Sequence, residues 1–541
     1  MNRGRRLRAP RRDGEVLIDP PFNDLPALVE LNAQQRAART CDLSGPSLAA
    51  LSDEARVELL AAARNYTGSY RDVGSQTSPS RIVLAGHQPE LFHPGVWAKN
   101  FVLSDLAKAN GATAVNLVVD GDTLKTASIR VPGGTRDQLH FDVEPFDASG
   151  DEVPSEERRV LDVPTWQGFG ARVVERLRPL GIDPLCRTLW PAVVERAKAC
   201  DRIGLAFAQA RHQFEGSLGL ETLELPQSRM CETRSFRRFA LNLLLELPRF
   251  VDVHNTALVE YRRRERIRSA NHPVPELVRD DAWHEAPLWI WTADDPRRRH
   301  LFARRVGDDL ELTDRARVTF RIPAPAGGKF ESAVEALEAA ARRGVRLRSR
   351  ALLTTMYARL VLSDLFLHGI GGAKYDELTD LLIERFFGVM PPQYAVVTAT
   401  KLLPLGGGEA KGPDPTALRQ RLWSIAHHPE RFLDREASSA LEERRRAQEF
   451  VAEKRRWIAV EADLANSRRR CQAIRAINRD LQPFVEAARQ SAEAELAAAR
   501  DRQSIRAVRD SREYAFCLFP QQEICDFLLE IVGRQRYLEP Q

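Results

Sequence analysis

Two apolar, strand-like runs are each followed by a short polar cluster, and this repeated arrangement constrains the fold more than any other feature of the chain. Residues 81–85 precede the cluster Gly86–Gln88, and residues 114–119 precede the cluster Asp120–Asp122. Between them, residues 95–111 show the apolar spacing of a helix and end at a glycine. A strand, a helix and a strand within about 40 residues predict a βαβ unit with parallel strands.

Both clusters are therefore expected at the carboxyl edge of one parallel sheet, where open α/β folds bind ligands. In the first cluster, Gly86 allows the backbone to approach a ligand closely, and loop N–H groups favour an anion. His87 can bind phosphate or transfer a proton near neutral pH, which makes it a candidate catalytic residue. Gly86, Gln88 and Lys99, on the following helix, are candidate cofactor-binding residues. The competing interpretation is a strand-end histidine that caps the loop, with Lys99 on a solvated helix face.

The second cluster places two carboxylates two residues apart, on either side of a glycine. Asp120 and Asp122 are candidate catalytic residues that can hold a ribose, a cationic amine or Mg²⁺ with its waters. Lys125 can supply positive charge to a leaving phosphate and is a further cofactor-binding candidate. An Asp-Gly turn between strands is the structural alternative. The pattern predicts no set of metal ligands and leaves a metal requirement open.

A third candidate is the pair Gly371 and Gly372, followed by Lys374. The two glycines can let a ligand approach the backbone, or they can simply stop the preceding helix. The sequence contains no Walker, GxSxG, HExxH or GxGxxG motif. His87 and His93 also lack the H-x-G-H spacing of nucleotidyltransferases.

Composition bears mainly on partners and location. The net charge of the 541-residue chain is only +5, and acidic and basic residues are interspersed, which does not favour a nucleic-acid partner. No apolar run approaches the ~18 residues of a membrane span, and residues 1–12 lack the apolar region of a secretory signal. Seven scattered cysteines without a CxxC pair are typical of reduced thiols. We therefore expect a cytoplasmic protein without a membrane partner.

The predicted fold is α/β, with a Rossmann-like parallel-sheet core, a helical insertion and a C-terminal antiparallel helical arm of coiled-coil type. An N-terminal extension covers residues 1–75, and the core covers residues 76–405, with the insertion at about 160–275. Residues 414–510 form the arm, and residues 511–541 are too apolar for a free tail and should pack back on the core. The arm allows a homodimer, but its imperfect heptads do not specify an oligomeric state.

Several segments resemble a known family. Residues 86–101 (GHQPELFHPGVWAKNF) are similar to the GHQ-containing segment of the bacillithiol-biosynthesis cysteine-adding enzymes. Residues 120–125 stand in the place of that family's acidic loop, and residues 352–404 and 511–520 resemble its glycine-rich and closing segments. The His-Gln-Pro start and the acidic loop also show a fainter likeness to WbqC-like proteins. The chain thus resembles a divergent member of the first family.

The resemblance implies a Rossmann-like core and a ligase-like enzyme that joins an amino acid, cysteine in that family, to the amine of an amino-sugar conjugate. It also implies ATP or another nucleotide, because forming an amide in water requires an activated acyl group. The chain departs from the family by lacking the second histidine in the first loop and over residues 163–275. Tyr375, or its neighbours Asp376 and Glu377, stands where the family has a glutamate. Two alternatives remain: a non-catalytic scaffold on a degenerate nucleotide-binding core, and a nucleotidyltransferase.

Overall fold

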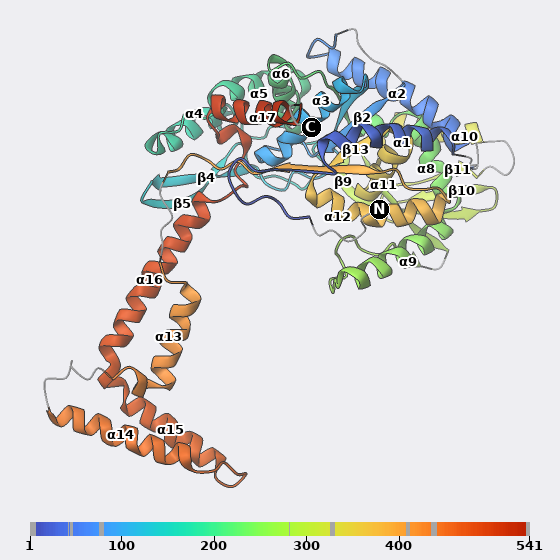
Figure 1. Ribbon diagram of the computed structural model, residues 1–541. Coiled ribbons are helices and arrows are strands. Elements are labelled where there is room, and N and C mark those ends of the chain that lie inside the picture. The colour runs from blue at the N-terminus through green and yellow to red at the C-terminus, as the bar shows by residue number, and fades with distance from the viewer. Residues whose placement is uncertain are drawn as a thin grey trace. The chain divides into compact units, whose positions relative to one another are not determined.

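The chain divides into two compact units in the computed structural model (Figure 1). The structure describes residues 7–39, 41, 43, 47–74, 80–280, 282–324, 330–406, 412–433 and 441–536. The sheet unit contains the chain up to residue 131, residues 142–404 and the chain from residue 512 onward. The helical unit contains residues 132–141 and 405–511. Part of the glycine-rich stretch between the predicted core and arm, residues 407–411, lies outside the described residues.

The sheet unit is built on a six-stranded sheet with the order β1-β14-β13-β2-β3-β6. The strands are β1 (Val16–Asp19), β14 (Tyr394–Ala399), β13 (Leu365–His368), β2 (Ile82–His87), β3 (Thr113–Val118) and β6 (Leu223–Pro226). β1 is antiparallel to β14, and all other neighbours are parallel. In chain order the parallel strands run 3-2-1-4-5, so the order reverses between β2 and β13. Open α/β sheets bind ligands beside such a reversal.

The predicted βαβ unit is confirmed at the centre of this sheet. β2 and β3 pair in parallel from Ile82 opposite Thr113 to His87 opposite Val118. They are joined by α3 (Pro94–Ala109), which begins with a proline in its first turn. Because both strands are buried on both faces, they consist of nearly continuous apolar residues. The carboxyl ends of β2 and β3 therefore meet at one edge of the sheet.

The segments predicted as an N-terminal extension and a helical insertion both contribute strands to this sheet. β1 forms one edge of the sheet, and β6 forms the other edge beside β3. The predicted helical insertion did not include β6, because a strand of four residues carries little periodic signal. The helices of that segment are α4 (Val163–Leu177), α5 (Cys186–Cys200), α6 (Ile203–Ser217), α7 (Gln227–Met230), α8 (Arg234–Leu245) and α9 (Leu247–Glu265).

The main hydrophobic core of the sheet unit joins the main sheet to its helices and extends through residues 286–337, which form most of a second sheet and a helix. It includes residues of β2, β3, β6, α8 and α9, and residues of α2 (Leu48–Gly68), α11 (Ala351–Tyr357) and α12 (Ile370–Leu382). The remaining helices of this unit are α1 (Leu25–Ala37), α10 (Phe330–Arg342) and α17 (Gln521–Arg536). Among the described residues, no helix is both long enough and apolar enough to cross a membrane.

A second, antiparallel sheet has the order β11-β10-β9-β8-β12, with β7 paired to β8. Its strands are β7 (Arg279–Asp280), β8 (Trp283–Thr292), β9 (Asp295–Val306), β10 (Asp309–Thr313), β11 (Thr319–Pro323) and β12 (Val345–Ser349). A separate ribbon pairs β4 (Ser128–Thr135) with β5 (Gln138–Pro145). The protein is therefore an α/β protein with one mostly parallel sheet, additional antiparallel sheets and C-terminal helices.

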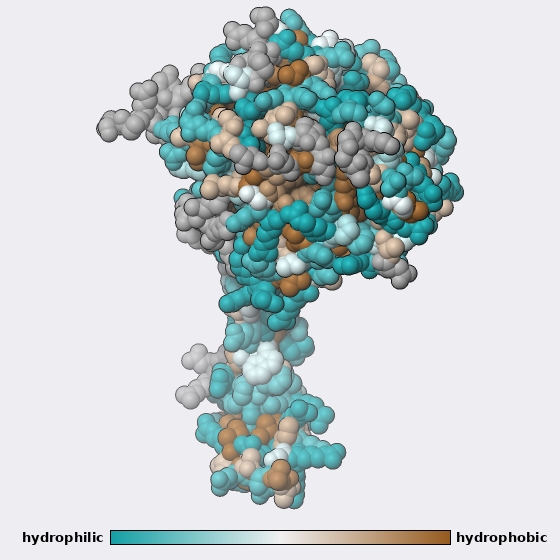
Figure 2. Space-filling model, turned by 90° about the vertical axis from the view of Figure 1, so that its right-hand side faces the viewer, coloured by the Kyte–Doolittle hydropathy of each residue, from teal (hydrophilic) through white to brown (hydrophobic). Residues whose placement is uncertain are grey.

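The helical unit contains α13 (Pro415–His427), α14 (Leu441–Ala459), α15 (Ser467–Asp480) and α16 (Glu486–Arg509). Apolar side chains join α13 to α16 and α14 to α15 in small separate clusters. α15 and α16 are separated by a short turn that contains Pro483, whose missing N–H disfavours a continuous helix. Figure 2 shows apolar side chains among the hydrophilic surface of this unit, where Leu441 and Leu464 are exposed.

Candidate functional site

The two predicted polar clusters meet at the carboxyl edge of the main sheet. The side-chain amide of Gln88 donates a hydrogen bond of 2.8 Å from Nε2 to Oδ2 of Asp122. The backbone N–H of Val119 donates to the carbonyl of His87 over 2.9 Å, which ties the end of β3 to the end of β2. The histidine loop after β2 and the aspartate loop after β3 therefore form one polar edge.

His87 presents a neutral imidazole at this edge. Its Nδ1 lies 3.0 Å from the carbonyl oxygen of Gln88. A carbonyl can only accept, so Nδ1 carries the proton and Nε2 is left with its lone pair. Burial and the nearby positive charge of Lys99 lower the pKa of His87 to about 3. His87 can accept a proton or a hydrogen bond at Nε2, and a bound anion would raise its pKa.

Lys99 is a buried cation that has no counter-charge in the part of the chain that the structure describes. Its side chain extends from α3 to donate a hydrogen bond of 2.8 Å from Nζ to the carbonyl of Gly86, and the residue is 3% exposed. The described residues provide it with no carboxylate partner, and burial together with Arg211 lowers the pKa of Lys99 to about 8. A buried ammonium group in this position favours an anionic ligand, because such a ligand would supply the missing charge.

Gly86 has a packing role as well as its predicted binding role. A Cβ atom at Gly86 would lie 3.2 Å from the carbonyl oxygen of Leu117 on β3. This distance is tighter than an ordinary van der Waals contact, so the glycine lets β2 and β3 approach each other. The close approach of the two strands therefore accounts for the presence of a glycine at position 86.

The two aspartates face different partners. Asp120 is fully buried, and its carboxylate accepts hydrogen bonds from the backbone N–H and the hydroxyl of Ser228, at 2.9 and 2.6 Å. Burial and the charge of Glu156 raise the pKa of Asp120 to about 7. Asp122 instead faces Gln88. The structure therefore brings Asp122, and not Asp120, to the histidine loop.

Asp122 also forms an ion pair that the sequence did not indicate. The guanidinium of Arg298, on β9 of the second sheet, lies 2.9 Å from Oδ1 of Asp122 and donates to the carbonyl of Gly121 at 3.0 Å. The same guanidinium lies over the ring of Trp289 at 4.8 Å. Arg298 is 176 residues from Asp122 in the chain, so no local pattern links them.

Glu90, in the histidine loop, lies near Lys125 and Asp122 of the second loop. Lys125 is exposed, whereas Glu90 is partly buried within the histidine loop. Burial raises the pKa of Glu90, the charge of Lys125 opposes that rise, and the charge of Asp122 adds to it. Glu90 is a candidate that the sequence analysis missed, although its place two residues after Gln88 was a usable signal.

The predicted glycine pair lies in the first turn of α12, directly after β13, the strand beside β2. A Cβ atom at Gly372 would lie 2.8 Å from Nδ1 of His368, so this glycine accommodates a buried histidine. His368 is itself held by Asp376, whose carboxylate lies 2.6 Å from Nε2. A Cβ atom at Gly371 would meet no atom of the described residues within 4 Å, so of this glycine pair Gly371 is the one with open space beside it.

The C-terminal segment brings an additional arginine to the same sheet edge. Arg512 donates from Nη2 to the hydroxyl of Thr398 at 3.0 Å and to the carbonyl of Ala399 at 3.2 Å, at the end of β14. A Cβ atom at Gly95, in the first turn of α3, would lie 2.2 Å from the carbonyl oxygen of Ala399. This close approach requires glycine, and His93 caps the helix by accepting from the N–H of Gly95 at 3.1 Å.

One buried cluster has the residue types of a metal site. His212, Glu215 and Glu224 each offer a ligand atom, and these atoms lie within 4.8 Å of one another. However, the guanidinium of Arg211 donates to both carboxylates, and Tyr70 and Thr222 contact the two ring nitrogens of His212. Protein groups already occupy this cluster, and we assign it a structural role.

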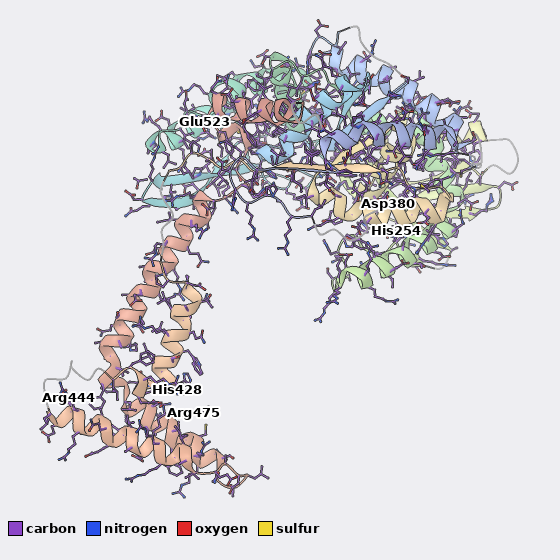
Figure 3. All side chains as sticks on the ribbon, viewed as in Figure 1. His254, Asp380, His428, Arg444, Arg475 and Glu523 are labelled. Atoms are coloured by element: carbon purple, nitrogen blue, oxygen red, sulfur yellow. The ribbon has the colours of Figure 1, made fainter. Side chains whose placement is uncertain are left out.

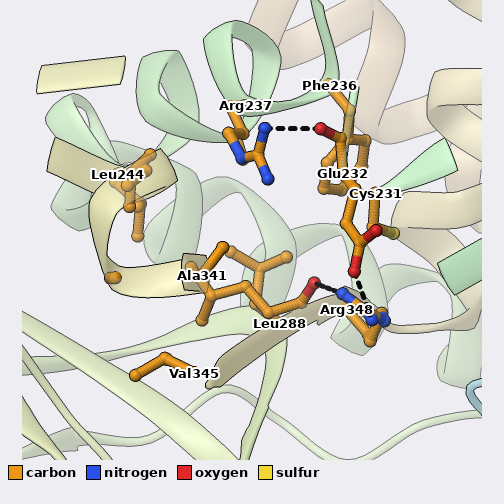
Figure 4. Close-up of a pocket in the computed structure, with 13 residues that line it drawn as sticks. Cys231, Glu232, Phe236, Arg237, Leu244, Leu288, Ala341, Val345 and Arg348 are labelled. Carbon is orange, nitrogen blue, oxygen red and sulfur yellow. Dashed lines mark hydrogen bonds and ion pairs between the residues drawn. The ribbon is translucent and has the colours of Figure 1, made fainter. Parts of the chain in front are cut away.

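Two cavities of the sheet unit are lined by neither His87 nor the two aspartates. The smaller has a volume of about 20 Å³ and lies beside Cys231, Phe236 and Arg348 (Figure 4). In that close-up, Arg348 pairs with Glu232. This volume suffices for a single water molecule and not for a substrate.

No family model matches this chain, and no curated protein matches it.

Proposed function

We propose that this protein is a ligase-like enzyme that joins an amino acid to the amine of an amino-sugar-type acceptor, with ATP or another nucleotide as the activating group. We interpret the main sheet as Rossmann-like. The 3-2-1-4-5 order of its parallel strands supports this interpretation, because dinucleotide-binding doubly wound folds have the order 3-2-1-4-5-6, of which this sheet shares five strands. The histidine loop follows the first of these strands, beside the reversal in strand order.

The observation that carries the proposal is the buried ammonium of Lys99 at the end of β2, 2.8 Å from the carbonyl of Gly86 and without a carboxylate partner among the described residues. The neutral His87 lies in the same loop. A phosphate group beside Lys99 would balance the buried charge and would raise the pKa values of both residues. Lys99, Gly86 and Gln88 would hold that phosphate, and Gly371 leaves open space at the neighbouring strand end.

The remaining groups suit amide formation. A bound nucleotide would activate the carboxyl group of the amino acid. Asp122 and Gln88 would hold the acceptor amine through its N–H groups. As the C–N bond forms and the bond to the leaving phosphate breaks, Nε2 of His87 would accept the proton that the amine loses. Preorganised charges of this kind contribute about 3 kcal/mol each to lowering a barrier.

The test is an assay of the full-length protein with ATP, cysteine and glucosamine, in which mass spectrometry detects the amide and chromatography detects the spent nucleotide. We expect His87→Ala and Asp122→Asn to abolish the product. Asp137→Asn changes an exposed aspartate outside the site and should keep activity. If the two site variants keep full activity, the site is misplaced.

A scaffold without catalysis is the second candidate, and one observation favours it. Both carboxylates of the aspartate loop already have protein partners: Asp120 bonds to Ser228, and Asp122 pairs with Arg298. A thermal-shift screen with nucleotides, amino acids and amino sugars separates the two candidates. Silence across this panel supports the scaffold. Pyrophosphate release without an amide product would instead indicate a nucleotidyltransferase.

We also propose a cytoplasmic location and a homodimer for this protein. All seven cysteines are free thiols, which fits a reducing, cytoplasmic environment. The paired helices of the helical unit, α13 with α16 and α14 with α15, are compatible with a coiled-coil arm and with a homodimer. Sedimentation of the full-length protein and of a Leu441→Glu variant, which changes an exposed apolar residue, would test for a dimer.

A further inference from the structure

A second cavity of the sheet unit runs along α12 and has no role in the function proposed above. Its volume is about 800 Å³, within the range of small-molecule sites. Residues of one face of α12 line it, together with residues from the end of α9, from the start of β14 and from the chain before and after β1. Asp380, labelled on α12 in Figure 3, is one of the lining residues.

Two tyrosines of this groove are fixed in place by the helix. The hydroxyl of Tyr261, on α9, donates to the carbonyl of Lys374 at 2.7 Å. The hydroxyl of Tyr394, on β14, donates to the carbonyl of the preceding residue, Ala373, at 3.3 Å. Their polar ends are therefore bonded to α12. Both residues line the groove together with Ile267 and Ile370, and Tyr394 is half-buried whereas Tyr261 is 4% exposed.

The carboxylates of the groove are already engaged. Glu265 and Glu377 both pair with Arg264, and the distance to Glu265 is 3.2 Å. Asp380 pairs with the buried Arg359 at 2.6 Å. Asp19, which also lines the groove, likewise already interacts with another group of the protein. An incoming cation would therefore have to compete with existing partners.

The uncompensated charge of the groove is positive. Lys374 is exposed on the groove side of α12, one turn after Ile370, and the described residues provide no carboxylate partner for its ammonium. Arg8 also lines the groove and is exposed, without such a partner among the described residues. A neutral or cationic ligand would leave both charges uncompensated, whereas an anionic ligand would pair with them.

We propose that this groove binds a small anionic molecule that carries a flat ring, with the ring packed along Tyr261 and Tyr394 and the anionic group held by Lys374. The anionic group can be a phosphate or a carboxylate, because an ammonium group binds either as a point charge. The tyrosine rings and the aliphatic side chains of Ile267 and Ile370 favour a flat ring over a polyhydroxylated one, because a flat ring can pack against them.

The test is isothermal titration calorimetry on the full-length protein with four probes. AMP combines a flat ring with phosphate, and indole-3-acetate combines a flat ring with carboxylate. Adenosine lacks the anion, and glucose 6-phosphate lacks the flat ring. We expect AMP or indole-3-acetate to bind, and we expect adenosine and glucose 6-phosphate to bind at least about tenfold more weakly. Which of the first two binds identifies the anionic group.

Lys374→Glu should weaken binding of the ring anion at least about tenfold, because it reverses the charge that holds the anion. Lys374 is exposed, so this variant should fold. Lys198→Glu is the matched control, since it reverses an exposed helix lysine on α5, outside the groove, and should leave affinity unchanged. Equal affinity of Lys374→Glu and wild type, or no binding of either ring anion, would overturn the proposal. Loss of binding in His87→Ala would overturn it too, because the ligand would then occupy the sheet edge.

Discussion

Gln88 and Asp122, which are 34 residues apart, share a hydrogen bond of 2.8 Å between the ends of two adjacent parallel strands. The bond places an amide and a carboxylate at the same sheet edge as the neutral ring of His87 and the buried ammonium of Lys99. Because Gln88 and Asp122 come from the loops that directly follow two paired strands, the backbone of the sheet sets the separation of these two side chains.

Replacement of Asp122 should separate function from stability. Its carboxylate is 39% exposed, and its ion pair with Arg298 is partly solvated, so Asp122→Asn should cost at most about 1 kcal/mol of stability. We expect the same variant to lose ligand binding and amide formation. Urea unfolding and the assay described above measure the two effects. Arg298→Gln should be equally mild in stability, and a loss of several kcal/mol in either variant would contradict this view.

Asp120 should make stability depend on pH. Its pKa is about 7 in the folded protein against 3.8 for an ordinary aspartate. The folded state therefore binds the proton more tightly, so this contribution to stability is complete below pH 3.8 and is lost as the pH rises through 7. Asn at position 120 can still accept from the N–H of Ser228 and cannot ionise.

Melting temperatures of wild type and Asp120→Asn between pH 5 and pH 8.5 test this prediction. The variant should lose less stability than wild type as the pH rises, and it should be the more stable protein at the upper end. Parallel curves for the two proteins would show that Asp120 does not titrate in this range.

An anion that binds beside Lys99 should stabilise the protein. Lys99→Met removes a buried charge but also removes the donor to the carbonyl of Gly86, so we expect the stability without ligand to change by no more than about 1 kcal/mol. Phosphate or ATP should raise the melting temperature of wild type and not that of the variant. Stabilisation of both proteins by the same amount would place the anion elsewhere.

The lowered pKa of Lys99 also determines the direction in which stability changes with pH. Its pKa is about 8 in the folded protein against 10.5 for an ordinary lysine, so the folded state releases the proton more readily. Stability should therefore rise as the pH increases from 8 towards 10.5. Lys99→Met should lack this rise. Chemical unfolding of the two proteins at pH 8 and pH 10 measures the difference.

Replacing Gly371 or Gly372 of α12 with alanine should have very different effects on stability. Gly371→Ala meets no atom and should leave stability unchanged or raise it by up to about 1 kcal/mol, because alanine favours a helix. Gly372→Ala places a methyl group against His368 and should cost about 1 to 3 kcal/mol. Thermal unfolding of both variants tests this contrast. If Gly371 contacts a ligand, Gly371→Ala should also weaken binding while the fold stays intact.

The predicted βαβ unit was accessible from the sequence because each of its parts is local. A buried parallel strand needs a continuous apolar run, and the helix that follows needs apolar residues at helical spacing. These requirements are met within residues 81–119 and fix the strand direction, and with it the common edge of Gly86–Gln88 and Asp120–Asp122. The four-residue β6 was missed because it is too short to show such a pattern.

What the sequence determined by itself was therefore the parallel unit and the place of its polar loops. Only the tertiary structure decided that Asp122 faces Gln88 while Asp120 faces Ser228, that Arg298 from another sheet pairs with Asp122, and that a groove opens beside α12. The physical reason is that periodicity records which face of an element is buried. The contacts of a side chain depend instead on elements far away in the chain, whose packing leaves no local pattern.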